Sequence, residues 1–318
     1  MKFAAVTALL PAPLAALLLA SVLACAGGGA GPFASPRQVD HPLVGRIWSQ
    51  AEEAALDWDG LARRAGQARF VLLGEIHDNA DHHRLQARLI ARLAAGPRPP
   101  AVVFEMLDRQ HQEAIDAFLA GGMRDPDVLA VRVGWAASGW PDFALYRPVF
   151  AAALDAGLPI LAAGLRAGVE DRDEGPEWQA RFGLTEPLPP EQQFARIEEM
   201  FTSHCELIPR EQLDAMVEMQ RARDARMADA LLRGAEARGR AVLIAGAGHA
   251  LRAGVPALLE RAGVASGAIL SVGFLEVDPQ ERRIEQTEAS EFDLVVFTPA
   301  AEREDPCERL RRRLDPGS

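Results

Sequence analysis

Two apolar runs in this chain each end in the pattern Gly-x-x-His, and this repeated arrangement constrains the fold more than any other feature. The run at 70–73 leads into a Gly-Glu-Ile-His motif that ends at His77, and the run at 241–245 leads into a Gly-Ala-Gly-His motif that ends at His249. Short uninterrupted apolar runs are typical of strands buried on both faces, as in a parallel sheet. The carboxyl ends of such strands form one crevice. We therefore expect His77 and His249 to face a common site.

Strand and helix signals alternate along most of the chain. Apolar runs predict strands at 70–73, 101–104, 159–162, 241–245, 268–277 and 293–297, and helical periodicity predicts helices at 81–95, 108–120, 142–156 and 254–262. This alternation predicts an α/β domain over residues 41–300, with a mostly parallel sheet flanked by helices. We expect the last two strands, joined across the segment 278–280, to form an antiparallel edge. Residues 301–318 are expected to form a C-terminal tail.

The alternation stops between residues 170 and 236. Stretches rich in acidic residues and proline separate helical patterns at 191–204 and 210–236, and no strand signal lies between them. We therefore expect a small helical subdomain, at about 170–236, inserted into the sheet domain.

The N-terminal segment has the features of a secretory signal. A short positive start is followed by an apolar stretch that ends at residue 24, directly before Cys25. This order is typical of a signal peptide at 1–24. The residues around Cys25 also resemble a bacterial lipobox, which implies lipidation of Cys25 and a place at the outer membrane, on its periplasmic side or at the cell surface. Residues 25–40 are expected to form the lipidated N-terminus and a flexible tether.

Charge and cysteine content limit the partners and the compartment. The formal net charge of −11 argues against a nucleic-acid partner, because binding phosphates requires clusters of Lys and Arg. Cys205 and Cys307 would be able to pair in an oxidising envelope compartment, but two cysteines do not define a disulfide framework. The sequence leaves their pairing open.

Polar residues follow three of the predicted strands. Glu75 and His77 follow the first, Glu105 follows the second, and His249 follows the fourth. Two histidines and two carboxylates suit a divalent metal such as Zn or Mn, or an acid–base pair acting on a polar substrate. Taken singly, each residue also has a structural explanation, as a hydrogen-bonded turn residue or a helix N-terminal acid. Their common position at strand ends favours a shared site.

Two helical segments carry further polar residues. His82 and Gln86 share one face of the helix expected at 81–95, whereas His83 lies about 100° further round, so we expect His83 to be solvated. In the segment 210–236, Gln220 and Asp224 lie on the apolar stripe. Because buried polar groups need partners, they either pair with each other or with Arg223, or face the crevice.

An aromatic segment at 134–150 includes Trp140 and the only tyrosine, Tyr146. It is either a loop held on the core by its tryptophans or a wall for a planar apolar molecule. In the second interpretation, Tyr146 is a candidate axial ligand for the ferric iron of haem, and Arg147 a candidate partner for a propionate.

Together these motifs resemble the ChaN family of haem-binding uptake lipoproteins, within the Tiki and erythromycin-esterase superfamily. The resemblance spans about residues 45–275 and rests on the following segments: 74–79, His82, His83, Gln86, 104–106, 140–141, 146–148 and 246–249. It implies a parallel sheet with a small helical domain, haem or iron handling at the bacterial envelope, and dimerisation around haem. Superfamily members with paired Gly-x-x-His motifs act as metal-dependent peptidases or esterases, which implies a catalytic set of Glu75, His77, Glu105 and His249.

We therefore expect a haem- or iron-binding outer-membrane lipoprotein involved in iron uptake. The expected haem-contacting residues are Tyr146, Arg147, His77, His82, Trp140 and His249. The alternative is a metal-dependent hydrolase that uses the two Gly-x-x-His motifs, and a third, weaker option is a crevice that serves only as a scaffold. The sequence does not decide whether the protein has catalytic turnover.

Overall fold

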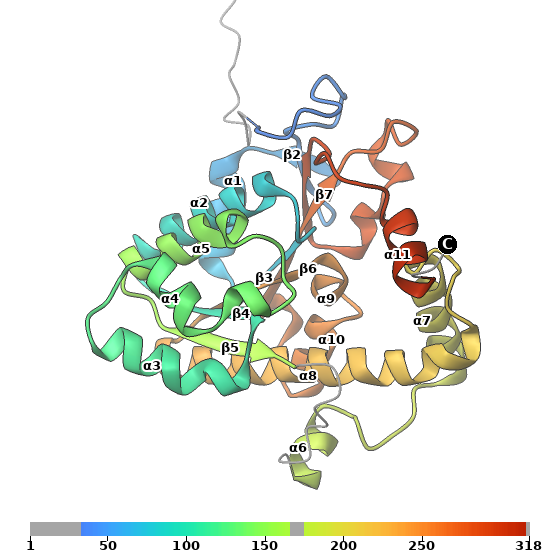
Figure 1. Cartoon of the computed structure of the whole chain (residues 1–318). Helices are drawn as coiled ribbons and strands as arrows, with labels where there is room; N and C mark the ends of the chain where they lie inside the picture. Colours follow the sequence, from blue (N-terminus) through green and yellow to red (C-terminus); the bar gives the residue numbers. More distant parts are fainter. Residues whose placement is uncertain (1–32, 166–174, 316–318) are drawn as a thin grey trace, which may run out of the picture.

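A computed structural model of the chain describes residues 33–165 and 175–315 (Figure 1). The expected signal peptide at 1–24, the lipidation site at Cys25 and the first part of the tether lie outside the described residues. Within the described ranges, no helix is both long enough and apolar enough to cross a membrane.

The core is one sheet of eight strands, in the order β2-β1-β8-β7-β3-β6-β4-β5. The strands are β1 (Ile47–Ser49), β2 (Ala54–Leu56), β3 (Phe70–Glu75), β4 (Ala101–Asp108), β5 (Ile160–Gly164), β6 (Ala241–Gly246), β7 (Ile269–Glu276) and β8 (Leu294–Thr298). The six strands from β3 to β8 run parallel to one another, which confirms the predicted α/β class. Because β3, β6 and β4 are adjacent, the ends of both Gly-x-x-His strands and of the Glu105 strand lie side by side.

The antiparallel edge of the sheet is not where the sequence placed it. β7 and β8 pair in parallel, with Val272 opposite Leu294, so the predicted antiparallel pairing of the last two strands is wrong. The connection at 277–293 includes two 3-10 turns and is long enough for the crossover that a parallel pair requires. The antiparallel edge is formed by the three-residue strands β1 and β2, which are too short to give a sequence pattern.

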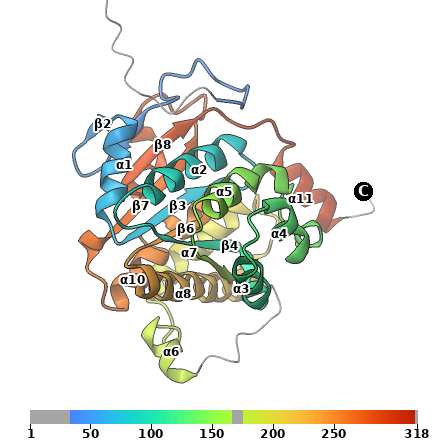
Figure 2. The same cartoon turned by 90° about the vertical axis from the view of Figure 1, so that its left-hand side faces the viewer.

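Helices cover both faces of the sheet (Figures 1 and 2). They are α1 (Trp58–Gln67), α2 (Ala80–Ala94), α3 (Gln112–Ala120), α4 (Pro126–Arg132), α5 (Phe143–Asp155), α6 (Pro176–Arg181), α7 (Pro190–Ser203), α8 (Leu213–Arg238), α9 (Ala247–Ala250), α10 (Val255–Arg261) and α11 (Pro306–Leu314). Side chains alternate along β3: Val71 and Leu73 pack with α1, α2 and α5, whereas Phe70 and Leu72 pack with α8 and α10. This two-sided burial explains why the strands read as uninterrupted apolar runs.

The expected helical insertion contains α6, α7 and α8, but α8 has two different parts. α7 lies against the first part of α8 and has no fully buried residue. From Asp224 onward most residues of α8 are buried, and this part packs on β4, β5 and β6. We call α7 together with residues 213–223 the helical arm. α8 thus connects the arm rigidly to the strand ends that form the site.

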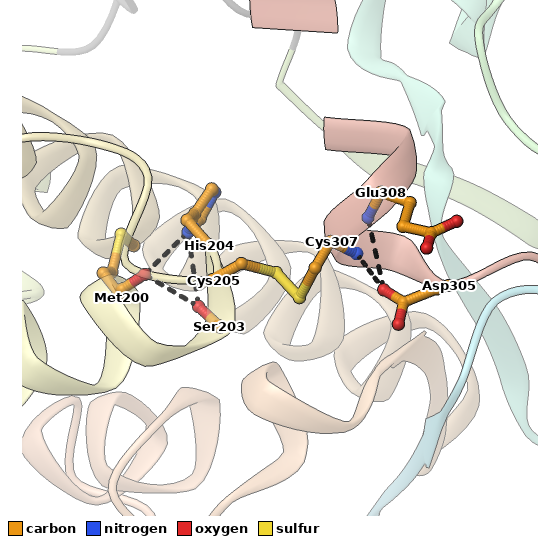
Figure 3. Close-up of a disulfide and its surroundings, with 7 residues drawn as sticks. All are labelled: Met200, Ser203, His204, Cys205, Asp305, Cys307 and Glu308. Atoms are coloured by element: carbon orange, nitrogen blue, oxygen red, sulfur yellow. Dashed lines mark hydrogen bonds between the residues drawn. A yellow bond between two sulfur atoms is a disulfide. The ribbon is translucent and has the colours of Figure 1, made fainter. Parts of the chain in front are cut away.

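A disulfide ties the arm to the C-terminal helix (Figure 3). Cys205 lies two residues beyond the end of α7 and is bonded to Cys307 in the first turn of α11. The sequence left this pairing open, and the structure forms it. The expected C-terminal tail therefore contains a helix that is covalently held to the arm.

Candidate functional site

The two Gly-x-x-His motifs pack against each other at the carboxyl ends of β3 and β6. A β-carbon on Gly246 would lie 2.9 Å from Nε2 of His77, so the His77 ring sits over this glycine. In return, a β-carbon on Gly74 would lie 2.7 Å from the Ala250 side chain and 2.9 Å from the Cα of Ala247, both in α9. Each glycine is therefore needed because the other motif approaches it closely. The repeated pattern forms one site, as predicted.

The two ring nitrogens of His77 have different surroundings. Its Nδ1 lies 3.1 Å from Oε1 of Glu75 and 3.2 Å from the hydroxyl of Tyr146. Its Nε2 has no hydrogen-bond partner among the described residues, and the side chain is 35% exposed. The ring also meets Trp140 edge-on, with the ring centres 4.9 Å apart. A carboxylate that orients one imidazole nitrogen leaves the other as a directed ligand atom.

The carboxylate of Glu75 is buried; its Oε1 accepts hydrogen bonds, whereas its Oε2 has only an ion-pair contact. Tyr146 donates its hydroxyl proton to Oε1 at 2.8 Å, and Nδ1 of His83 lies 3.0 Å from Oε2. Burial alone would raise the pKa of Glu75, but the charge of His83 and the hydrogen bond from His77 hold it well below its ordinary value. Glu75 is therefore ionised and acts as the anionic support for His77.

His83 is buried in the site, so the prediction that it is solvated is wrong. Its Nε2 donates to the carbonyl of His77 at 3.1 Å. Its Nδ1 faces Glu75 and, at 3.3 Å, Oε1 of Gln86, whose amide orientation is fixed by donation from its Nε2 to the carbonyl of Leu73. Because both ring nitrogens face acceptors, His83 carries two protons. Burial opposes this charge, but Glu75 raises the pKa of His83 above its ordinary value.

The sequence predicted that His82 contacts haem, but the structure gives this residue a structural role instead. It is buried, its Nδ1 accepts the backbone N–H of Ile76 at 2.9 Å, and its Nε2 lies 2.8 Å from Oγ1 of Thr298 on β8. Burial and the charge of His83 lower the pKa of His82 to about 3, so the ring is neutral. Helix periodicity places His82 and His83 on different faces of α2 and therefore suggested that only one of them is buried. Both are buried because the first turn of α2 is covered from both sides.

His249 lies between two carboxylates. Its Nδ1 is 2.5 Å from Oδ1 of Asp224 on α8, and its Nε2 is 3.2 Å from Oε1 of Glu105 on β4. Glu105 also accepts the backbone N–H of Gly246 at 2.8 Å. Burial opposes the imidazolium, but Glu105 and Asp224 raise the pKa of His249 to about 10. The amide of Gln220 lies against the same ring, so Gln220 and Asp224 both face the site rather than pairing with Arg223.

The structure leads us to revise the expected roles of Tyr146 and Arg147. The Tyr146 hydroxyl is buried behind His77, and burial together with Glu75 raises its pKa, so it does not present a phenolate to the crevice. Arg147 is exposed and its Nε lies 2.9 Å and 3.1 Å from the two oxygens of Asp127 on α4. Neither side chain lines the crevice; His77 does not line it either, but its ring contacts Trp140, which does.

A crevice of about 320 Å³ opens beside this cluster, at the low end of the range for small-molecule sites. Its lining residues are Glu105, Asp108, Ser138, Gly139, Trp140, Ala163, Gly164, Leu165, Arg223 and Met227. Sequence analysis missed Arg223 as a site residue. Its position, one helical turn from Gln220 and from Met227, is the signal that would have placed it on the same face of α8.

A sequence model described as "Haem-binding uptake, Tiki superfamily, ChaN" matches residues 61–259, more than half of the chain, and includes both Gly-x-x-His motifs. The chain belongs to the ChaN family. No curated protein matches it.

One solved structure of the ChaN family shares this fold. ChaN of Campylobacter jejuni, solved as a study of cofacial haem binding, has a TM-score of 0.63 and 22% identity, and the match covers 79% of this chain and 95% of that chain. A mutant of erythromycin esterase EreC in its open conformation is more distant, with a TM-score of 0.45, 14% identity and coverage of 82% and 99%. The type III effector HopBA1 has a TM-score of 0.43, 16% identity and coverage of 76% and 92%.

In this ChaN chain, Glu75, His77, Glu105 and His249 are not arranged as a divalent-metal site. Among the described residues, no three His, Cys, Asp or Glu side chains converge in a way that would hold a metal ion. Both nitrogens of His249 face carboxylates, and Glu105 is held by His249 and Gly246. The geometry therefore gives no support to the Zn or Mn alternative. It leaves His77 as the histidine with an unengaged nitrogen beside the crevice.

Proposed function

We propose that this ChaN-family protein binds haem in the crevice beside His77, with Nε2 of His77 as the protein ligand to iron. The observation that carries the proposal is that only one of the two ring nitrogens of His77 is engaged by a neighbouring residue. Its Nδ1 is held by ionised Glu75, whereas its Nε2 has no partner among the described residues and belongs to a side chain that is 35% exposed. Histidine is a common axial ligand of haem iron, and a carboxylate behind the ring increases its basicity.

The residues around the crevice also suit a porphyrin. Trp140 and Met227 offer apolar surface, and Trp140 meets the His77 ring directly. Gly139 and Gly164 add no side chain to the lining. When bound, haem supplies an iron that needs an axial ligand and a flat apolar ring that needs cover from water. The crevice and His77 together meet both requirements.

The test is a haem titration followed by visible spectroscopy. We expect the Soret band of haem to shift and to saturate when haem is titrated into wild-type protein. In His77→Ala we expect a change in the haem absorption bands that depend on the axial ligand of the iron, and binding that is weaker by at least about tenfold. His41→Ala is the matched control because His41 is also half-buried but belongs to a different part of the chain, where its Nδ1 accepts the backbone N–H of Leu43 at 3.3 Å. Unchanged spectra and affinity in His77→Ala would contradict the proposed ligand. A flat wild-type titration would contradict haem binding itself.

We further propose that the protein works in iron uptake as a lipoprotein of the outer membrane, anchored through Cys25. The supporting features are the signal-like segment at 1–24 and the lipobox-like residues before Cys25. Membrane fractionation of cells that express wild-type or Cys25→Ser protein tests the anchor. Loss of the variant from the membrane fraction is expected, and equal membrane retention would contradict it.

Haem-dependent dimerisation is the remaining part of the proposal. A crevice of about 320 Å³ is small for a macrocycle, so a second copy would give the exposed part of the ligand additional cover from water. Sedimentation velocity with and without one equivalent of haem tests this. We expect a shift from monomer to dimer on haem addition, and a monomer under both conditions would contradict it.

A further inference from the structure

Arg223 lies at the wall of the crevice and forms no ion pair with any residue of the described ranges 33–165 and 175–315. It projects from α8, is half-buried, and lines the crevice together with Trp140 and Met227. Its Nε is buried and has no hydrogen-bond partner within the described part of the chain. A guanidinium has only donors to offer, and leaving them unmet in a partly desolvated place is costly. This arrangement indicates that a bound molecule supplies the missing acceptor.

The carboxylates nearest to Arg223 in the site are already occupied. Asp224 contacts His249 at 2.5 Å, and Glu105 contacts His249 and the backbone of Gly246. Asp108, which also lines the crevice, has an interaction of its own. These carboxylates are therefore already engaged by groups other than Arg223.

Two other arginines of α8 each pair with an acidic residue of the same helix. Arg221 contacts Glu218 at 2.8 Å one turn earlier, and Arg233 contacts Asp229 at 3.0 Å. These pairs use the i, i+3 and i, i+4 spacings that helices favour. Arg223 has Met219 and Gln220 at the corresponding earlier positions and Met227 at a later one, none of which is an acid. Arg223 therefore has no acid at these spacings, at the point where α8 reaches the crevice.

We propose that Arg223 binds a carboxylate of the molecule that fills the crevice. The inference rests on the proposed haem function, in which the carboxylate is a propionate. Arginine suits this role because its planar fork donates two parallel hydrogen bonds to one carboxylate. Arg223 thereby replaces Arg147, the partner expected from the sequence, which is exposed and paired with Asp127.

The experiment compares haem with its dimethyl ester, in which both propionates are neutral. Each ligand is titrated into wild-type protein, Arg223→Gln and Arg147→Gln, and binding is followed by the Soret band. We expect the wild type to prefer the free acid by about 10-fold or more, as for a hydrogen-bonded charged group. Arg223→Gln should lose this preference by weakening only free-acid binding, whereas Arg147→Gln should keep it.

Arg223→Lys provides the second variant. It retains the charge but not the planar fork, so we expect an intermediate preference for the free acid. If Arg223→Gln retains the full wild-type preference, the assignment of Arg223 is overturned while haem binding stands. If wild-type protein binds neither ligand, the proposed haem function fails and the inference fails with it. The far-ultraviolet circular dichroism of each variant checks that the fold is intact.

Discussion

The imidazole of His77 lies directly over Gly246: a β-carbon there would be 2.9 Å from Nε2 and 3.1 Å from Cε1. The backbone of Gly246 adopts φ −56° and ψ 147°, which any residue can adopt. This glycine is therefore required by the ring above it rather than by its own conformation. The contact couples the second Gly-x-x-His motif to the nitrogen that we propose as the iron ligand.

Gly246→Ala is expected to displace the His77 ring and weaken haem binding by about tenfold, as for other changes that misdirect a ligand. The neighbouring Gly248→Ala is a matched control, because a β-carbon at Gly248 meets nothing within 4 Å. Haem titration measures both. Equal affinities for the two variants would show that the ring position is unimportant for binding.

Tyr146→Phe is expected to leave the haem spectrum almost unchanged, because its hydroxyl is buried and bonded to Glu75 at 2.8 Å. Removing this donor leaves the Glu75 carboxylate with one hydrogen bond fewer, which costs about 1–3 kcal/mol of folding free energy. Urea unfolding measures the loss, and visible spectroscopy tests the ligand. Loss of the ligand-dependent band in this variant would instead make Tyr146 the ligand.

The stability of the protein should depend on pH through the pair His249 and Glu105. The pKa of His249 is raised from 6.5 to about 10, so its contribution is complete below about pH 6.5 and is lost as the pH rises towards 10. Burial opposes ionisation of Glu105, but the charge and hydrogen bond of His249, the charge of His77 and the backbone N–H of Gly246 together lower its pKa from 4.5 to about 2. Its contribution is complete above about pH 4.5 and is lost as the pH falls towards 2.

The contribution of this pair to the free energy of unfolding is therefore expected to be highest between about pH 4.5 and 6.5 and to fall on the alkaline side. Urea unfolding between pH 5 and 10 measures this decrease. His249→Gln should remove much of it, whereas the half-buried His204→Gln should retain the wild-type profile. An identical alkaline decrease in both variants would exclude His249 as its source.

The Cys205–Cys307 disulfide closes a long loop, with 102 residues of sequence separation. Replacing both cysteines with serine should lower the free energy of unfolding by about 2–5 kcal/mol, because the unfolded chain gains conformational freedom. Denaturant unfolding with and without a reductant measures this. The haem spectrum should not change, because neither cysteine lines the crevice. Equal stability with and without reductant would contradict a stabilising disulfide.

Much of the fold followed from local sequence patterns. The apolar runs that became β3, β4, β5 and β6 were long enough to predict, because both faces of these strands are buried under helices. The edge strands β1 and β2 were missed because a strand of three residues is too short to show an alternating pattern of apolar and polar residues. The pairing of β7 with β8 was misjudged because the turn-like segment 278–280 is only part of a longer crossover.

For the site, the sequence by itself determined that Glu75, His77, Glu105 and His249 lie at or near the carboxyl ends of strands, because the apolar runs fix where the strands lie. Only the tertiary structure made β3, β6 and β4 neighbours. The tertiary structure alone also decided which of these groups are charged and how their side chains are oriented. Tyr146 comes from α5 and Asp224 from α8, and these partners keep the Tyr146 phenol protonated, charge His249 and orient His77. No local pattern contains such information, because hydrogen bonds and charge interactions depend on distances between residues that are far apart in the chain.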